Sequence, residues 1–316
     1  LETSSIYIHD QEKGTTQCWF TIKNENDAAK SISDQMTIDL KATWVGRKMQ
    51  SFYQSSAPVT SIVMQGKHRL EWMRYCEEQS TLFSTSKFYG ETIPSRTYHL
   101  CKFSNGFIGA ASPGEISEES WDLLKRATAV FSFAYTRFYE LQKAEKRARE
   151  TQIEMALEKV RSRTMTMERS SELADTSVVV FKELLNLGIA PNRLFIGIIK
   201  NNGDAIEAWA TNEDGSKIEN QFELHPTKNK SIQKMVDAWK QEKKSTIIDM
   251  QGQELKDYFH YLNKVMHIPF IDGLQQKRRV QTIAYFSGGL IGMAAPEEQP
   301  QETIVLLERF AAVFNL

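Results

Sequence analysis

The stretch "FSNGFIGAASP" (Phe103 to Pro113) returns in the second half of the chain as "FSGGLIGMAAP" (Phe286 to Pro296). The residues that follow match as well: "LLKRATAVF" (Leu123 to Phe131) corresponds to "LLERFAAVF" (Leu306 to Phe314). Glycine beside polar residues, flanked by alternating apolar residues, is typical of a β-hairpin, so we expect positive φ at Asn105-Gly106 and Gly288-Gly289. Each copy is therefore predicted to end in a hairpin and a helix.

Working outward from the hairpins, the similarity continues toward the start of each copy. "SIVMQG" (Ser61 to Gly66) corresponds to "IIDMQG" (Ile247 to Gly252). Further upstream, "IYIHDQEKGTTQCWFT" (Ile6 to Thr21) corresponds to "IGIIKNNGDAIEAWAT" (Ile196 to Thr211). Matches that keep the same order in both halves indicate two copies of one domain.

Each copy shows the same succession of elements. A strand, a polar turn and a second strand come first, followed by a polar stretch with a helix, a short strand, a helix with two aromatic residues, and the closing hairpin and helix. The expected positions are Ser5–His9, Trp19, Leu40–Gln54, Met64 and Trp72/Tyr75 in copy one, and Leu194–Lys200, Trp209, Lys230–Lys243, Met250 and Tyr258/Tyr261 in copy two. Strands joined by hairpins, without regular βα alternation, predict an antiparallel α+β domain.

Copy two has a further helix in front of it, expected from Ser171 to Leu187. Ser170 or Ser171 is suited to its N-cap, and Gly188 to its end. Copy one starts too late to hold this helix. Because the chain also begins with Leu1 and not with Met, we expect it to be a piece of a longer protein.

The segment from Trp121 to about Thr166 contains neither Gly nor Pro and is rich in good helix formers. Apolar or small residues recur every seven positions, at Ala127, Ala134, Leu141, Ala148 and Met155, with Phe131 and Phe138 between them. This spacing is typical of a coiled-coil seam. The seam weakens at Glu145 and Gln152, and its phase then shifts to Ile153, Leu157 and Val160. Two interpretations stay open: a paired helix that connects two globular domains, or a single helix that packs on its own domains.

These patterns predict a domain at residues 1–138, a helical linker at 139–168 and a second domain at 169–316. The chain has 316 residues, 41% of them hydrophobic and 25% charged, which is ordinary globular composition. Its net charge of −1 gives no reason to expect nucleic acid or an anionic membrane as a partner. No apolar run is long enough to span a bilayer, and no secretory signal is visible. We therefore expect a cytoplasmic protein.

The strand order, the hairpin strands "GFIGAASP" and "GLIGMAAP" and the flanking helices resemble GAF domains, the ligand-sensing modules of signalling proteins. The connecting segment from Glu145 to Thr176 is similar to segments that join such domains in bacterial sensor histidine kinases. The resemblance implies a six-stranded antiparallel sheet with helices on one face and a small-molecule pocket on the other. It also implies parallel dimers whose connecting helices pass a signal to a downstream effector. The Asn-Lys-Phe-Asp-Glu pattern of cyclic-nucleotide-binding members is absent from both copies.

Aromatic side chains are the candidates for a pocket, because ligand pockets are mostly apolar with a few polar groups. The alternative is that they are simply core residues. The candidates are Trp19, Tyr53, Trp72, Tyr75 and Phe103 in copy one, and Trp209, Trp239, Tyr258, Tyr261 and Phe286 in copy two.

No residue pattern predicts a catalytic or metal site. The six histidines are scattered, so no metal is expected, and no cofactor can be named. The cluster Lys277, Arg278 and Arg279 is interpreted as a solvated strand end and not as a phosphate site. The three cysteines, Cys18, Cys76 and Cys101, all lie in copy one, and some GAF-fold enzymes use pocket cysteines to reduce methionine sulfoxide.

We interpret the chain as the sensory part of a signal-transduction protein, most simply a two-component histidine kinase. It would be a homodimer through the linker helix, and its enzymatic output domain would lie outside these residues. In this interpretation a ligand shifts the population of helix registers, with the weak point at Glu145 and Gln152. Two alternatives remain: a dimerisation scaffold without a ligand, and a cysteine-dependent reductase.

Overall fold

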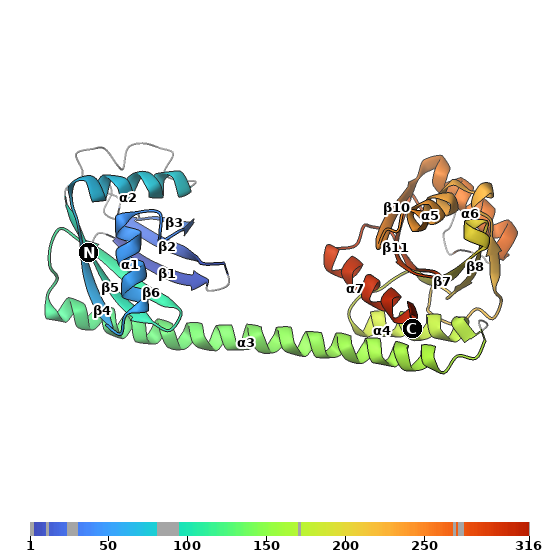
Figure 1. The fold of residues 1–316 in the computed structure, drawn as a ribbon, viewed down its shortest axis with the longest axis horizontal. Coiled ribbons are helices and arrows are strands. Elements are labelled where there is room, and N and C mark those ends of the chain that lie inside the picture. The colour runs from blue at the N-terminus through green and yellow to red at the C-terminus, as the bar shows by residue number, and fades with distance from the viewer. Residues whose placement is uncertain are drawn as a thin grey trace. The chain divides into compact units, whose positions relative to one another are not determined.

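The computed structural model (Figure 1) describes residues 3–10, 13–23, 31–80, 95–169, 172–267, 270 and 275–315, without the side chains of 31, 32 and 266. The chain divides into two compact units, Leu1–Ala144 and Glu145–Leu316. This boundary falls inside the residues expected to form the linker. Ser170 and Ser171, the expected N-cap residues, lie outside the described residues.

The first unit is built on one antiparallel sheet with the strand order β3-β2-β1-β6-β5-β4. The strands are β1 (Thr3–Asp10), β2 (Thr15–Lys23), β3 (Ser31–Ile38), β4 (Val59–Met64), β5 (Arg96–Phe103) and β6 (Gly106–Ser112). Two helices, α1 (Trp44–Gln54) and α2 (Gly66–Gln79), pack on one face of the sheet around buried residues such as Met49, Trp72 and Phe107. The α1 helix begins after Thr43, whose side chain accepts a hydrogen bond from Gly46 N at 3.0 Å.

The second unit repeats this design. Its sheet has the order β10-β11-β12-β7-β8-β9, which is the order of the first sheet read from the other edge. The elements are α4 (Leu173–Asn186), β7 (Arg193–Lys200), β8 (Ala205–Ala210), β9 (Phe222–Leu224), α5 (Lys230–Lys240), β10 (Ser245–Gln251), α6 (Gly252–Met266), β11 (Arg278–Phe286), β12 (Gly289–Ala295) and α7 (Gln301–Ala312). Two six-stranded antiparallel sheets with helices confirm the predicted α+β class and the repeat.

The second sheet is covered by helices on both faces, which corrects the expectation of helices on one face only. The helices α4 and α7 form a core with one face, around Leu184, Trp209 and Phe310. The helices α5 and α6 form a separate core with the other face, around Met235 and Phe259. Both faces must be covered because both are apolar: side chains on alternate positions of the central strands enter different cores.

The α3 helix (Glu118–Met165) runs without interruption for 48 residues. In the first unit Leu124 and Thr128 are buried, and Phe131 packs edge-on against Phe103, with ring centroids 5.3 Å apart. Phe131 therefore belongs to the first unit's own packing and not to a coiled-coil seam. The seven-residue series from Ala127 to Met155 is exposed instead.

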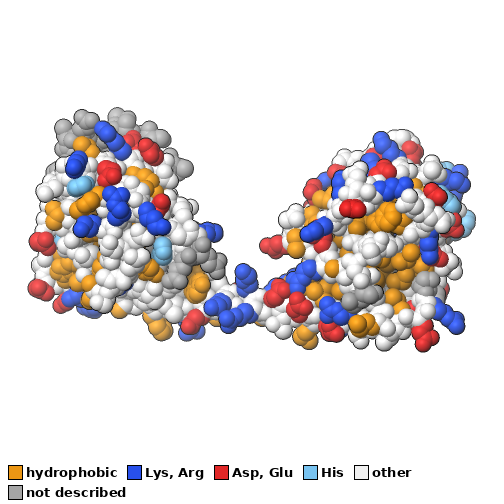
Figure 2. All heavy atoms as spheres, in the orientation of Figure 1, with side chains coloured by type: hydrophobic (Ala, Val, Ile, Leu, Met, Phe, Trp, Pro, Cys, Tyr) orange, Lys and Arg blue, Asp and Glu red, His pale blue; other side chains and the backbone are white. Residues whose placement is uncertain are grey.

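The phase shift that begins at Ile153 also has a local cause. Ala156, Leu157 and Val160 are buried in the core of the second unit, beside α4 and α7. The salt bridge between Lys159 and Glu183, at 3.0 Å, joins α3 to α4 within that unit. The middle of α3 is exposed and carries mainly charged side chains (Figure 2). The helix thus changes its apolar phase because it packs first on one unit and then on the other.

The hairpin glycines are required for a reason other than the expected one. A positive φ is found at none of the four turn residues, Asn105, Gly106, Gly288 and Gly289. A Cβ on Gly106 would instead lie 1.8 Å from Tyr7 O on the neighbouring strand, and a Cβ on Gly289 would lie 2.0 Å from Gly197 O. Both glycines are needed because two backbones approach closely there.

Among the described residues, no helix is both long enough and apolar enough to cross a membrane.

Candidate functional site

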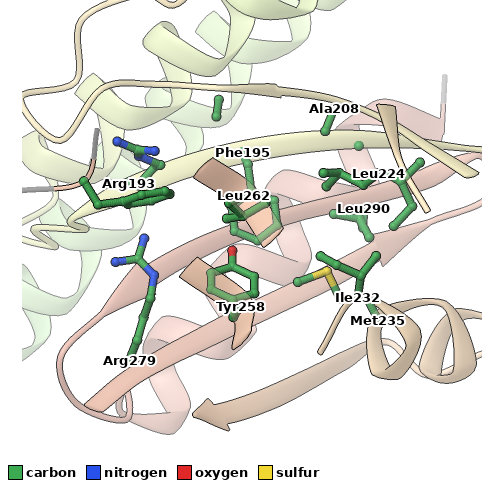
Figure 3. A pocket seen from close by; sticks show the side chains of 14 residues that line it. Arg193, Phe195, Ala208, Leu224, Ile232, Met235, Tyr258, Leu262, Arg279 and Leu290 are labelled. Atoms are coloured by element: carbon green, nitrogen blue, oxygen red, sulfur yellow. The ribbon is translucent and has the colours of Figure 1, made fainter. Parts of the chain in front are cut away.

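A mostly enclosed cavity lies in the second unit between the sheet and the helices α5 and α6 (Figure 3). Its wall is almost entirely apolar and includes Phe195, Leu224, Ile232, Met235 and Leu290. The space that the centre of a water molecule can reach is about 40 Å³, enough for roughly two or three waters. Only a slim group could enter this cavity without displacing side chains.

The alternation of side chains along the central strands decides what faces the cavity. On β7, Arg193, Phe195 and Gly197 line the cavity, whereas Leu194 and Ile196 enter the opposite core. On β11, Arg279 lines the cavity from the face that also carries Ile283. The period of two therefore directs two arginines into the interior of the unit.

In the first unit, larger side chains stand at two of the positions that line this cavity. Gly197 pairs with Leu290 and Ala208, and in the same register of the first sheet Tyr7 pairs with Phe107 and Cys18. Tyr7 therefore occupies the position of Gly197, and it is buried.

A second pair of positions also differs between the units. Ala210 pairs with Phe195, and in the first unit Phe20 pairs with Ser5 at the equivalent place. The second unit thus has a smaller residue on one strand and a larger one on its partner, and both Ala210 and Phe195 line its cavity.

One end of the cavity is polar. Arg193, Arg279 and Tyr258 line this end, and the two guanidinium groups lie at the same end of the pocket (Figure 3). Arg193 is 4% exposed and Arg279 is 2% exposed. The Tyr258 hydroxyl accepts a hydrogen bond from Gln281 Nε2 at 2.6 Å, which leaves its own proton free to donate.

The two guanidinium groups are held by aromatic rings more than by acceptors. The Arg193 Cζ lies 4.3 Å and the Arg279 Cζ 5.5 Å from the centre of the Phe270 ring. Arg279 also donates to Gln276 Oε1 at 3.4 Å and hydrogen-bonds to the Tyr258 hydroxyl. Within the described residues, Nε and Nη1 of Arg193 and Nε of Arg279 are buried without a hydrogen-bond partner. Unpaired buried donors of this kind are rare in native proteins.

Burial lowers the pKa of both guanidinium groups, and the charge of Arg279 lowers the pKa of Arg193 further. Glu213 opposes these shifts but makes no hydrogen bond through its buried Oε1. Arginine stays protonated in proteins even so. Among the described residues, two buried positive charges therefore lie near one carboxylate, that of Glu213, so the described groups at this end carry an excess of positive charge.

Of the aromatic candidates in the second unit, Tyr258 lines the cavity and the others lie elsewhere. Trp209 is buried in the opposite core, and Phe286 stacks on Phe314 with ring centroids 5.3 Å apart. The Tyr261 hydroxyl accepts a hydrogen bond from His225 N at 2.8 Å, outside the cavity. Trp239, on α5, is half-buried and does not line the cavity either.

In the first unit the candidates fall into three places. Trp72 is buried in the core, where its Nε1 donates to the Tyr98 hydroxyl at 3.2 Å. Trp19 lines an open groove over β1, β2 and β3, where its Nε1 donates to Gln35 Oε1 at 3.0 Å. The remaining three make other contacts: the Tyr75 hydroxyl accepts from Asp39 N, the Tyr53 hydroxyl donates to Ser104 O, and Phe103 packs on α3. The structure thus does not gather these residues into one pocket.

Neither arginine is among the residues that the sequence predicts for the site. No sequence pattern singles out Arg193, and the basic cluster at 277–279 predicts a solvated strand end that would include Arg279. Arg278 does fit that assignment, since its Nη2 lies 2.9 Å from Asp249 Oδ2 and the pair is partly exposed. Arg279 does not, because it is buried on the other face of the same strand. Counting the period of two from Ile283 would have placed Arg279 inside.

The three cysteines are buried and form no disulfide. Burial raises the pKa of the Cys18 thiol to about 12 and that of the Cys76 thiol well above its ordinary value. A catalytic cysteine needs the opposite, a lowered pKa with solvent access. In the described residues, no group of three His, Cys, Asp or Glu side chains is placed to hold a metal ion.

We therefore expect the native protein to react slowly with Ellman's reagent at pH 8. The thiols are inaccessible, and the raised pKa of Cys18 and Cys76 keeps both protonated at that pH. After unfolding in guanidinium chloride all three should react within the mixing time. Rapid reaction of Cys18 or Cys76 in the native protein, located by mass spectrometry, would reopen the reductase alternative.

The comparison with solved structures finds similar chains, one of which is described below. No model of a protein family matches the chain, and no curated protein matches it. The crystal structure of the A. Aeolicus nlh2 gaf domain in an inactive state is similar, with a TM-score of 0.31 and 12% identity, over 53% of this chain and 91% of that chain. At that TM-score the likeness supports no conclusion about ligand or activity.

Proposed function

We propose that this chain is a sensory region of a signal-transduction protein and that its second unit binds a small molecule in the cavity beside Tyr258. The first unit serves as a structural copy, and α3 carries the response to an output domain such as a bacterial histidine kinase. The binding step would act by population shift, since a ligand can favour only the state to which it binds better. We assign no catalytic role to these residues.

The observation that carries this proposal is the difference between the two copies. Both have the same strand order, but the first unit has Tyr7 and Phe20 where the second has Gly197 and Ala210, and the enclosed cavity lies beside these two small residues. A cavity of this kind is a cost to stability unless something occupies it. An apolar cavity with a few convergent polar groups is the usual form of a small-molecule site.

The exposed stripe, defined as Leu123, Ala127, Val130, Ala134 and Leu141, supports pairing of α3 with a second copy of the chain. These residues follow a spacing of three and four along one side of the helix, apart from the Arg137 position. Leu123 is 67% exposed, Val130 71% and Leu141 55%. Apolar residues at this spacing are the seam of a two-stranded coiled coil. We propose a homodimer through this stripe.

A scaffold without a ligand is the second candidate function. It is favoured by the first unit, which has the same strand order with larger residues, Tyr7 among them, packed in its core. In that case the second cavity would be a packing defect, and only the exposed stripe would matter.

Native mass spectrometry of the whole chain separates the two candidates. We expect a mass increment at gentle settings that is lost at denaturing settings. The variant Ala210→Phe should abolish the increment, because it introduces the side chain that fills the equivalent place in the first unit. Val305→Phe, on an exposed position of α7, is the control and should keep it. An increment that survives in Ala210→Phe, or its absence from the wild-type chain, would favour the scaffold.

A further inference from the structure

The polar end of the cavity in the second unit has three properties that its apolar wall does not explain. Two guanidinium groups are buried there, several of their N–H donors lack acceptors within the described residues, and Glu213 balances only one of the two charges. Burying a charge without a full set of partners is strongly unfavourable. A structural role alone would be served better by an apolar pair.

The first unit shows that the fold does not need this pair. Arg193 pairs with Ala294 on β12, and Thr3 pairs with Ala111 at the same place in the first sheet. Arg279 pairs with Met250, and Arg96 pairs with Met64. The first unit therefore keeps one arginine at these positions and has a threonine at the other. Arginine stands at both of these positions in the second unit, the unit whose cavity both residues line.

Guanidinium groups select for a particular partner. Each presents N–H donors in a planar fork that matches the two oxygens of a carboxylate. The Tyr258 hydroxyl adds a third donor on the same side of the cavity (Figure 3). Behind this end the wall is formed by aliphatic residues such as Ile232, Met235 and Leu290, with no charged group along it in the described residues.

We propose that the cavity binds a small carboxylate with a slim aliphatic tail, with the carboxylate at the polar end lined by Arg193, Arg279 and Tyr258 and the tail along the apolar wall. The anion would supply the missing acceptors and offset the excess positive charge at once. The tail must be narrow, because the free space is small and Gly197 cannot gain a Cβ without meeting Ile206 Cγ2 at 2.7 Å. This assignment rests on the proposed function, since it names the class of ligand for the same cavity.

Isothermal titration of the whole chain with hexanoate tests the assignment. Hexanamide has the same tail without the charge, and acetate has the charge without the tail. We expect hexanoate to bind at least roughly tenfold more tightly than either, because hydrogen bonds to charged groups and burial of apolar surface each contribute about that much.

Two variants of adjacent residues make the test specific. Arg279→Met should weaken hexanoate at least roughly tenfold while leaving hexanamide unchanged, and it should raise the melting temperature of the unliganded protein because it removes an underpartnered buried charge. Arg278→Met, which alters only the exposed pair with Asp249, should leave hexanoate binding unchanged. Arg279→Lys keeps the charge and should recover part of the affinity.

The outcomes separate this inference from the proposed function. Equal binding of hexanoate and hexanamide, both lost in Ala210→Phe, would overturn the carboxylate assignment and leave the cavity as a ligand site. Hexanoate binding that is unaffected by Arg279→Met would overturn it as well. If hexanoate does not bind, and the compound that causes the native mass increment is identified and is not an acid, only the assignment of the ligand class is overturned. If Ala210→Phe changes neither the mass increment nor the binding of any probe, both the carboxylate assignment and the proposed function are overturned.

Discussion

Gly106→Ala is expected to unfold the first unit at markedly lower temperature than in the wild-type chain. The added Cβ would lie 1.8 Å from Tyr7 O and 2.8 Å from Tyr7 C, and these are backbone atoms that no side-chain rotation can move aside. Strand β6 would have to separate from β1 at their shared end. We expect a loss of about 3 kcal/mol, near the upper end for overpacking, and a fall in melting temperature of roughly 10 °C or more.

Differential scanning calorimetry gives the size of the effect, and hydrogen exchange assigns it to the first unit. Gly289→Ala should act in the same way on the second unit, where the Cβ would lie 2.0 Å from Gly197 O. Gly114→Ala is the matched control: no atom lies within 4 Å of its added Cβ and its φ is not positive, so it should be neutral. A Gly106→Ala protein as stable as the Gly114→Ala protein would show that the two backbones are not in close approach.

The double variant Val130→Lys with Leu141→Lys is expected to convert the dimer into a monomer. Both residues belong to the exposed stripe of α3, and a lysine in a coiled-coil seam buries a charge without a partner. The loss of two buried apolar side chains adds to this, so dimerisation should weaken roughly a hundredfold or more. Neither residue packs on its own unit, so each unit should remain folded.

Sedimentation equilibrium measures the change. The control is Leu185→Lys with Val305→Lys, which places two lysines on apolar helical positions of comparable kind, each 45% exposed, in the second unit. This control should stay dimeric. A wild-type chain that sediments as a monomer at tens of micromolar, or a double variant that stays dimeric, would rule out the exposed stripe as the dimer interface.

The sequence predicts the repeat and the fold class because these depend on patterns that both copies share. It misses β3 and β9 as strands, and the six-stranded sheet was expected only from the resemblance to GAF domains. Strand β3 reads "SISDQMTI", an edge strand in which Asp34 interrupts an otherwise apolar face and every second residue is polar, and β9 has only three residues. Such edge strands are fixed by pairing with their neighbours, which composition does not show.

The seam of α3 illustrates a different limit. The periodicity of Ala127, Ala134 and Leu141 is real, but Phe131 has the same spacing and packs on Phe103 within its own unit. A heptad pattern does not reveal which of two adjacent faces meets the folded domain. The candidate site shows the same limit. Large aromatic residues are the usual candidates for a pocket in a sequence, whereas this cavity is lined by the small residues Gly197 and Ala210 and by a buried arginine.

The burial of Leu157 and Val160 in the second unit has a consequence for how a signal could travel. These residues are 5% and 0% exposed, so the end of α3 forms part of the hydrophobic core of the second unit. At its other end Leu124 and Thr128 complete the packing of the first unit. A helix packed in this way cannot slide or rotate against either unit without opening that unit's core. For the same reason a fragment that begins at residue 169 would lack a wall of its own domain.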